Sequence, residues 1–214
     1  MDDDTTRTPL GAQEALAIIA DQRAAAARTQ PSAALLFGVW GTAWVVGYGL
    51  LWVAARDESS WSAWSSWAAV VAAVVILGAM GVTVWHTAVR THGIRGRSAQ
   101  QGAMYGWAWF LGFLGQGVIV AALAQAGASR EVVGIAANSV AALVVGLLYL
   151  AGGAMWRATA MYVLGAWILL AGATSAFAGI PGSYAVLALA GGGGMLVAAL
   201  VTRVTSARGG RTRG

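Results

Sequence analysis

Long apolar runs separated by short polar segments make up the chain from residue 33 onward. Six of these runs are long enough to cross a bilayer, because a spanning helix needs about 20 mostly apolar residues. Acidic residues and arginine occur only near the ends of the runs. The pattern predicts six transmembrane helices at 33–54, 67–89, 103–125, 132–156, 158–179 and 183–204.

The connections between the predicted spans are short and leave no room for a second folded domain. Glycines and a proline at 179–182 end one helix and precede the next. We therefore expect an all-α polytopic membrane protein with one transmembrane domain at 33–204. Three helical hairpins of similar design are one arrangement that fits, because Ala-Met-Tyr occurs at both 103–105 and 160–162.

Both ends of the chain differ from the spans. In the N-terminal segment 1–32, residues 11–29 favour helix and have prolines on either side. Leu16 and Ile19 lie on a narrow apolar face of this short amphipathic helix. The helix either lies at the membrane interface or packs on the bundle or on a partner. The C-terminal segment 205–214 is a short basic tail.

Composition supports the same class of protein. Hydrophobic residues make up 58% of the 214 residues and charged residues only 10%, against about 25% charged in soluble domains. A mean hydropathy of +0.69 excludes an ordinary soluble domain and a disordered chain. Cysteine is absent, which excludes disulfides and thiolate chemistry.

Arginine placement predicts the orientation of the spans. All 13 basic residues are arginine, and 11 of them lie in the N-terminal segment, the second and fourth connections and the tail. Arg56 and Arg130 lie on the opposite side, and each is followed by an acidic residue. Because cytoplasmic segments carry the arginine excess, we expect a multi-pass protein of the inner (cytoplasmic) membrane with both termini in the cytoplasm.

The sequence lacks the residue patterns of common catalytic sites. Without lysine there is no phosphate-binding P-loop and no Schiff base. His86 and His92 are the only histidines, and no cluster of acidic residues and histidine resembles a metal site. We therefore predict no enzyme activity, no catalytic residue, no metal and no cofactor. Nucleic-acid binding is not expected either, because the arginines are scattered at helix ends.

Polar residues within the apolar runs are few and share one depth. Gln116 and Asn138 both fall in the outer half of their spans, and we expect them to face each other or to share a polar cluster with Ser139, Thr174 and Ser175. A buried amide without a partner is costly in hydrocarbon. The cluster either fixes helix register through interhelical hydrogen bonds or forms a small outward-facing polar cavity.

Two further features of the spans allow two interpretations each. Trp40, Trp44 and Trp167 lie deeper than the interfacial belt where tryptophan is common. They either line an apolar ligand pocket or fill space between small-residue helix faces. Gly191, Gly192, Gly193 and Gly194 lie near the middle of the last span. They form either a hinge or a flat face for a close neighbour.

Two segments carry a resemblance. EALAIIADQRAAAART (14–29) and PSAALLFGVWGTAWVVGYGLLW (31–52) resemble small six-helix membrane proteins of high-GC bacteria, which are described as transporters or left uncharacterised. The layout is also similar to the membrane subunits of ABC-2-type exporters, whose second loop is cytoplasmic and docks on an ATPase. That similarity implies docking through Arg90, Arg95 and Arg97. The chain departs from it between the last two spans, where Gly-Ile-Pro-Gly-Ser replaces re-entrant helices.

The leading hypothesis is a transporter-like or permease-like protein. It would work as a facilitator or with an energising partner, because the chain has no nucleotide site or intramembrane acid of its own to energise transport. The alternative is a non-transporting scaffold or sensor subunit. Besides the bilayer, the expected partners are a membrane or cytoplasmic protein, such as an ATPase, or a second copy. A polar path through the bundle favours transport, and a dry bundle with an exposed small-residue face favours a scaffold.

Overall fold

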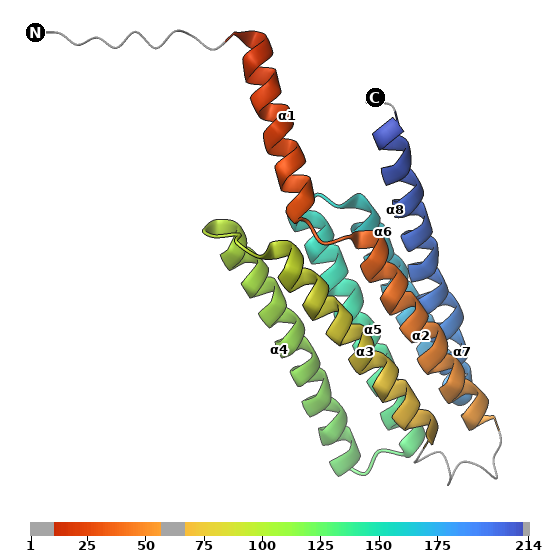
Figure 1. The fold of residues 1–214 in the computed structure, drawn as a ribbon. Coiled ribbons are helices and arrows are strands. Elements are labelled where there is room, and N and C mark those ends of the chain that lie inside the picture. The colour runs from red at the N-terminus through yellow and green to blue at the C-terminus, as the bar shows by residue number, and fades with distance from the viewer. Residues whose placement is uncertain (1–10, 57–66, 212–214) are drawn as a thin grey trace, which may run out of the picture.

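A computed structural model describes residues 11–56 and 67–211 of the chain. The described part consists of helices joined by short turns, with no strand, so the prediction of an all-α fold is confirmed (Figure 1). The elements in chain order are α1 (Ala12–Thr29), α2 (Ala33–Ala55), α3 (Trp67–Thr91), α4 (Arg97–Gln125), α5 (Arg130–Met155), α6 (Thr159–Phe177), α7 (Gly179–Val186), the π-helix η3 (Leu187–Gly192) and α8 (Gly193–Arg211).

Six helical stretches are long and apolar enough to cross a membrane, as the sequence predicts. The sixth is built from α7, η3 and most of α8. The third begins at Arg97, six residues before its predicted start at 103, because the segment after Gly96 contains no proline and is rich in residues that favour helix, Arg97, Gln100 and Gln101 among them. The second connection is therefore shorter than expected, since most of 90–101 belongs to α3 or α4.

The helices pack in two groups. In one, α2 contacts α3, α8 and η3; in the other, α5 contacts α4 and α6. Helix α7 contacts α2, α5 and α6 and so joins the groups. Although α3 and α4 follow each other in the chain, α3 packs mainly on α2 and α4 on α5. Helix α4 has no buried residue, so it lies at the edge of the bundle.

Glycine permits the closest helix contacts, because hydrocarbon provides no hydrophobic drive between spans and backbones must approach closely to gain packing energy. The α5–α6 contact is the clearest case. A Cβ on Gly153 would lie 2.6 Å from the backbone nitrogen of Tyr162, and one on Gly165 would lie 2.7 Å from that of Leu150. Neither position accommodates alanine without moving a neighbouring backbone.

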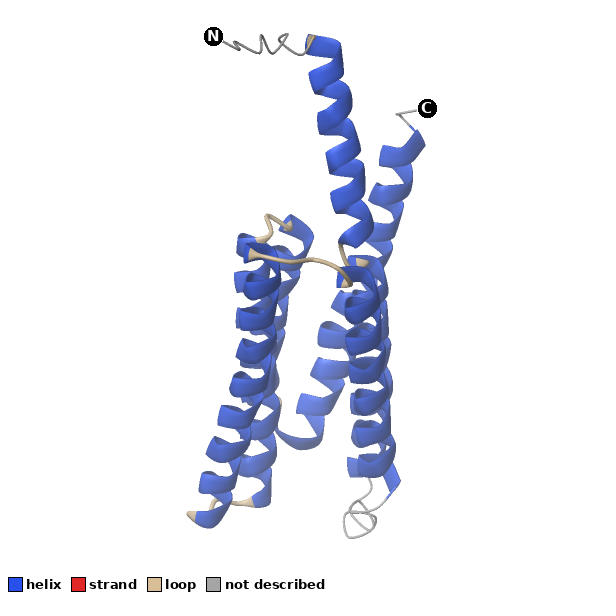
Figure 2. Cartoon of the chain, turned by 60° about the vertical axis from the view of Figure 1, so that its left-hand side comes forward, coloured by secondary structure: helices blue, strands red, loops and turns tan. Residues whose placement is uncertain are grey.

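Helix α1 extends beyond the bundle, roughly in line with it, and does not lie across its end (Figures 1 and 2). Its described side chains, Ala12–Gln22, are exposed apart from a partly buried Ala15. The described chain begins and ends at the same end of the bundle (Figure 1), as an even number of spans requires.

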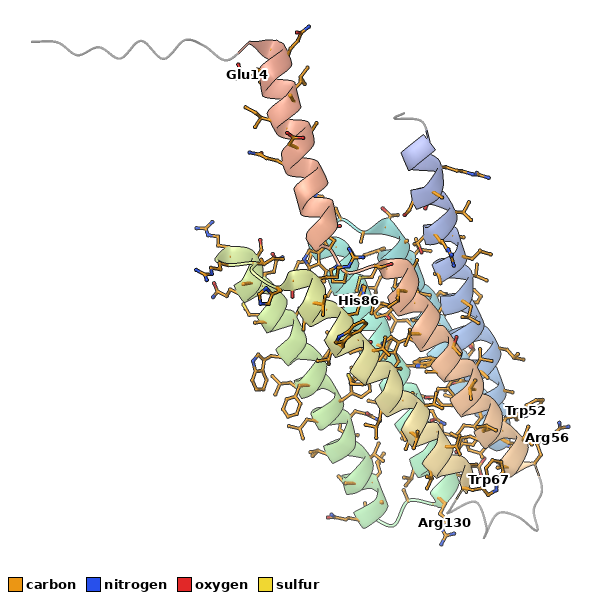
Figure 3. The ribbon with its side chains drawn as sticks, viewed as in Figure 1. Glu14, Trp52, Arg56, Trp67, His86 and Arg130 are labelled. Carbon is orange, nitrogen blue, oxygen red and sulfur yellow. The ribbon has the colours of Figure 1, made fainter. Side chains whose placement is uncertain are left out.

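One hydrogen bond ties the start of α2 to α3. The backbone N–H of Ser32, the N-cap of α2, donates to Nε2 of His86 over 3.0 Å. His86 is buried and lies toward the α1 end of the bundle (Figure 3). Trp52, Arg56, Trp67 and Arg130 mark the opposite end (Figure 3).

Candidate polar site in the membrane

Four of the five predicted polar residues, all but Thr174, lie on or beside α5, about 12 Å from its first residue at a rise of 1.5 Å per residue. Gln116 of α4 donates its side-chain N–H to the carbonyl oxygen of Ala137 over 3.0 Å. Ala137 directly precedes Asn138 and Ser139. Successive residues of a helix point about 100° apart, so these three positions of α5 face different neighbouring helices.

Asn138 lies beside α7. Its side chain lies near the Tyr184 phenol, and one turn earlier a Cβ on Gly134 would lie 3.8 Å from Ile180. These two pairs share one register, in which α5 and α7 run in parallel. The Asn138 amide nitrogen is buried and has no hydrogen-bond partner within the described part of the chain.

Ser139 lies at the interface between α5 and α6. A Cβ on Gly172 would meet the Ala142 methyl group, and one turn outward the antiparallel register brings Ser139 level with Ser175. Ser175 is fully buried, and its hydroxyl donates to the carbonyl oxygen of Gly172 over 2.7 Å. The hydroxyl oxygen of Ser139 is buried, and no described residue pairs with it.

Ser183 of α7 completes the arrangement. It is fully buried, and its hydroxyl makes no hydrogen bond to the described residues. Ser175 and Ser183 stand four residues before and four residues after Gly179, where the chain reverses with a φ of +62° that favours glycine. We call the group formed by Asn138, Ser139, Ser175, Ser183 and Tyr184 the polar junction.

Ser183 and Tyr184 are not among the site residues predicted from the sequence. Both follow the helix-breaking glycines and proline directly, which is the position of a boundary residue. Their spacing from Gly179 could have indicated their position. Ser183 lies four residues after the reversal and Ser175 four residues before it, so the two lie at a similar depth.

Thr174 does not join the polar junction. Its side chain is exposed, and its hydroxyl donates to carbonyl oxygens of its own helix, those of Leu170 and Ala171. This is the usual arrangement for hydroxyls in these helices. Among the described residues, seven bond to a carbonyl three or four residues earlier: Thr83, Thr91, Thr174, Ser175, Thr202, Thr205 and Ser206. The hydroxyls of Ser139 and Ser183 make no such bond although they are buried.

A row of aromatic rings connects the polar junction with the middle of the membrane. Tyr184 stacks on Tyr48 of α2 with ring centroids 6.3 Å apart. Tyr48 in turn makes an edge contact of 5.4 Å with Trp44. Trp44 is buried and packs against η3, where a Cβ on Gly191 would lie 2.7 Å from its ring.

The three deep tryptophans pack against different neighbours. The Trp40 indole donates to the Thr83 hydroxyl over 2.9 Å and thereby joins α2 to α3. Trp44 packs against Gly191 and Tyr48. Trp167 is half-exposed on α6, and its indole donates to the carbonyl oxygen of Ala190 over 2.8 Å.

Three of the four consecutive glycines are packing positions. Gly191 faces Trp44, Gly192 faces Val45 and Gly194 faces Trp167, each too closely for a Cβ, whereas a Cβ on Gly193 would meet open space. Gly191 and Gly192 belong to the π-helix at Leu187–Gly192, which lies near the middle of the last span. Turns of π-helix are frequent at functional sites.

The three candidate docking arginines lie together at the α3–α4 turn. Arg90 is in the last turn of α3, Arg95 is in the connection and Arg97 opens α4. All three are exposed.

The polar junction holds hydrogen-bonding groups without formal charge. No acidic or basic residue occurs in α5 between 132 and 155, in α6 or in α7. Glu131 lies between the polar junction and the Arg130 end of the bundle, and a Cβ on Gly179 would come within 3.4 Å of its carboxylate. No group of three metal-binding side chains occurs among the described residues. The junction can therefore pair with neutral polar groups and offers no counter-charge to an ion. Comparisons with protein-family models, curated proteins and solved structures found no match.

Proposed function

We propose that this membrane protein is transporter-like and that the polar junction is part of its substrate path. One observation carries the proposal: buried polar atoms of Asn138, Ser139 and Ser183 have no partner among the described residues, and all three lie where α5, α6 and α7 meet. Unpaired polar groups are costly within a membrane, and polar residues kept there commonly mark substrate paths.

The last span supports this proposal. Carriers commonly bind substrates beside discontinuous helices whose irregular backbone lines the path. Here the π-helix η3 interrupts the last span three residues after Tyr184. The resemblance of 14–29 and 31–52 to proteins described as transporters is consistent with this function.

The proposed protein is a facilitator or depends on an energising partner. Its spans contain no acidic side chain away from their ends, so proton or sodium coupling lacks the groups on which it usually relies. The arginine distribution further supports an orientation with both termini in the cytoplasm, in the inner (cytoplasmic) membrane of the cell. An ATPase partner would then meet the α3–α4 turn with Arg90, Arg95 and Arg97.

Reconstitution tests the proposal. The purified protein, alone and with any ATPase that co-purifies from native membranes, is placed in liposomes and exposed to inward gradients of neutral and charged solutes. Transport predicts that at least one solute enters faster than into protein-free liposomes. If none does in either preparation, the transport proposal is wrong.

A scaffold or sensor subunit is the second candidate, and α4 favours it. This helix has no buried residue and packs mainly on α5. On its other faces, Gly102, Gly106, Gly115 and Gly117 have open space beside them, and small residues promote contacts between spans. A scaffold predicts a stoichiometric membrane-protein partner, which mild-detergent isolation and mass spectrometry would identify.

A further inference from the structure

The unpaired atoms of the polar junction define which molecule would suit it. The Asn138 amide nitrogen can only donate, whereas the hydroxyls of Ser139 and Ser183 can donate and accept. A molecule that satisfies all three atoms must offer at least one acceptor together with further donor or acceptor groups. An apolar molecule would leave these atoms unpaired at the cost of several kcal/mol.

The surroundings exclude a charged ligand on energetic grounds. The segments that form the polar junction carry no acidic or basic residue in 132–155 of α5, in α6 or in α7. Burying an ion without a counter-charge is far more costly than burying a neutral polar group. Tyr48 and Tyr184 add aromatic faces on one side. The combination suits a molecule that is small, uncharged and rich in hydrogen-bonding groups.

Serine geometry distinguishes this junction from ordinary helix packing. A serine or threonine hydroxyl in a helix can satisfy itself on a carbonyl one turn back, and seven hydroxyls among the described residues do so. Ser183 makes no such bond although it is fully buried. The backbone is not helical at Ile180, three residues earlier (φ −99°, ψ 130°), so the Ser183 hydroxyl has no regular helical turn before it to bond to and is left for another molecule.

We propose that the polar junction binds a small uncharged molecule that both donates and accepts hydrogen bonds, of the class of short polyols and simple amides. The inference rests on the proposed transport function, since it names the class of substrate that the same site takes. Ser175 and Ser183 of the polar junction lie only four residues from the α6–α7 reversal, which is at the end of the bundle that carries Arg56 and Arg130. Such a molecule therefore enters from that end.

Glycerol and acetamide serve as probes, and three proteins are compared. These are the wild-type protein, Ser183→Ala, which removes the unpaired hydroxyl, and Thr174→Ala, which removes a hydroxyl bonded to its own helix. In the binding arm, unfolding temperatures in detergent are measured against probe concentration. In the transport arm, light scattering follows probe entry into proteoliposomes, with sodium chloride as the charged comparator.

We expect at least one probe to raise the unfolding temperature of wild type and Thr174→Ala more than that of Ser183→Ala. Protein-dependent entry of that probe should fall roughly two- to ten-fold in Ser183→Ala, as expected for one lost hydrogen bond, and stay unchanged in Thr174→Ala. Without probe, Ser183→Ala should be at least as stable as wild type, because an unpaired buried hydroxyl is unfavourable.

The two arms separate the inference from the transport proposal. A probe-dependent difference in stability without entry of any solute supports binding and contradicts transport. Equal responses of wild type and Ser183→Ala to both probes overturn the inference, even if sodium chloride crosses, because the junction then holds water only. A less stable Ser183→Ala also overturns it, since the hydroxyl would then make a structural hydrogen bond.

Discussion

Tyr105 and Gln116 attach α4 to α5 by the same kind of hydrogen bond, three helical turns apart. Tyr105 donates its hydroxyl to the carbonyl oxygen of Leu148 over 2.8 Å, and Gln116 donates its amide to that of Ala137 over 3.0 Å. Donors (105 and 116) and acceptors (148 and 137) are each eleven residues apart, as antiparallel helices in one register require. The two bonds therefore fix both the depth and the rotation of α4.

Removing these donors should loosen α4. Tyr105→Phe and Gln116→Leu each remove one interhelical hydrogen bond, which in membrane proteins contributes about 0.6 kcal/mol on average. Because α4 has no buried residue, little other packing compensates for the loss. We expect a loss of stability of about this size for each variant, measured by unfolding in mixed detergent micelles, with faster hydrogen exchange in α4 than in α6.

The Gln116 variant also separates the two roles of the polar residues. Asn138 and Ser183 do not depend on the bond from Gln116 to Ala137, so the solute permeability per folded molecule should stay within about two-fold of wild type. A Gln116→Leu protein that folds normally but loses all transport would instead make Gln116 part of the substrate path.

The glycine run offers a matched set of substitutions. Gly194→Ala places a methyl group against the Trp167 indole, and Gly191→Ala places one 2.7 Å from the Trp44 ring. Overpacking of this kind costs about 1–3 kcal/mol. Gly193→Ala meets open space and should be neutral or stabilising, because alanine has the higher helix propensity.

Thermal unfolding of the three variants checks this order of stability. If the glycines act as a hinge, Gly193→Ala should also slow solute permeation although it fits the folded protein. Permeation at the wild-type rate in Gly193→Ala would assign the run to close packing alone. Similar destabilisation of all three variants would contradict the difference between Gly193, which faces open space, and Gly191 and Gly194, which face tryptophan rings.

The positions of the spans could be predicted from the sequence, because the hydrocarbon core excludes charged side chains and requires hydrogen-bonded backbone over a length that the apolar runs match. Gln116 and Asn138 were expected at one level, and the hydrogen bond from Gln116 to Ala137 lies beside Asn138.

It was harder to predict which side of each helix faces the bundle and which faces lipid. In water the apolar stripe of a helix marks its buried face, whereas a span is apolar on its lipid-facing side as well. Nothing in the apolar pattern shows that Trp44 is buried and Trp167 half-exposed, or that α4 is peripheral. Ser183 and Tyr184 become recognisable only when the reversal at Gly179 brings them level with Ser175.

His86 should stabilise the connection between α1 and α2. Its Nε2 accepts the Ser32 N–H, so His86→Leu leaves that N–H without its partner, at a cost of about 1 kcal/mol. We expect faster hydrogen exchange at residues 32–35 in His86→Leu, with partial rescue in His86→Gln, whose side-chain oxygen can accept a hydrogen bond. Unchanged exchange in His86→Leu would show that water replaces the imidazole.

The orientation of the chain can be tested because the protein has no cysteine of its own. Single cysteines at His92 and Ala128 lie in the turns at opposite ends of α4. The arginine excess beside His92 predicts a cytoplasmic position for this turn. A membrane-impermeant maleimide should therefore label Ala128→Cys in intact cells, and His92→Cys only after the membrane is permeabilised. The reverse labelling pattern would invert the orientation and place the polar junction in the cytoplasmic half of the membrane.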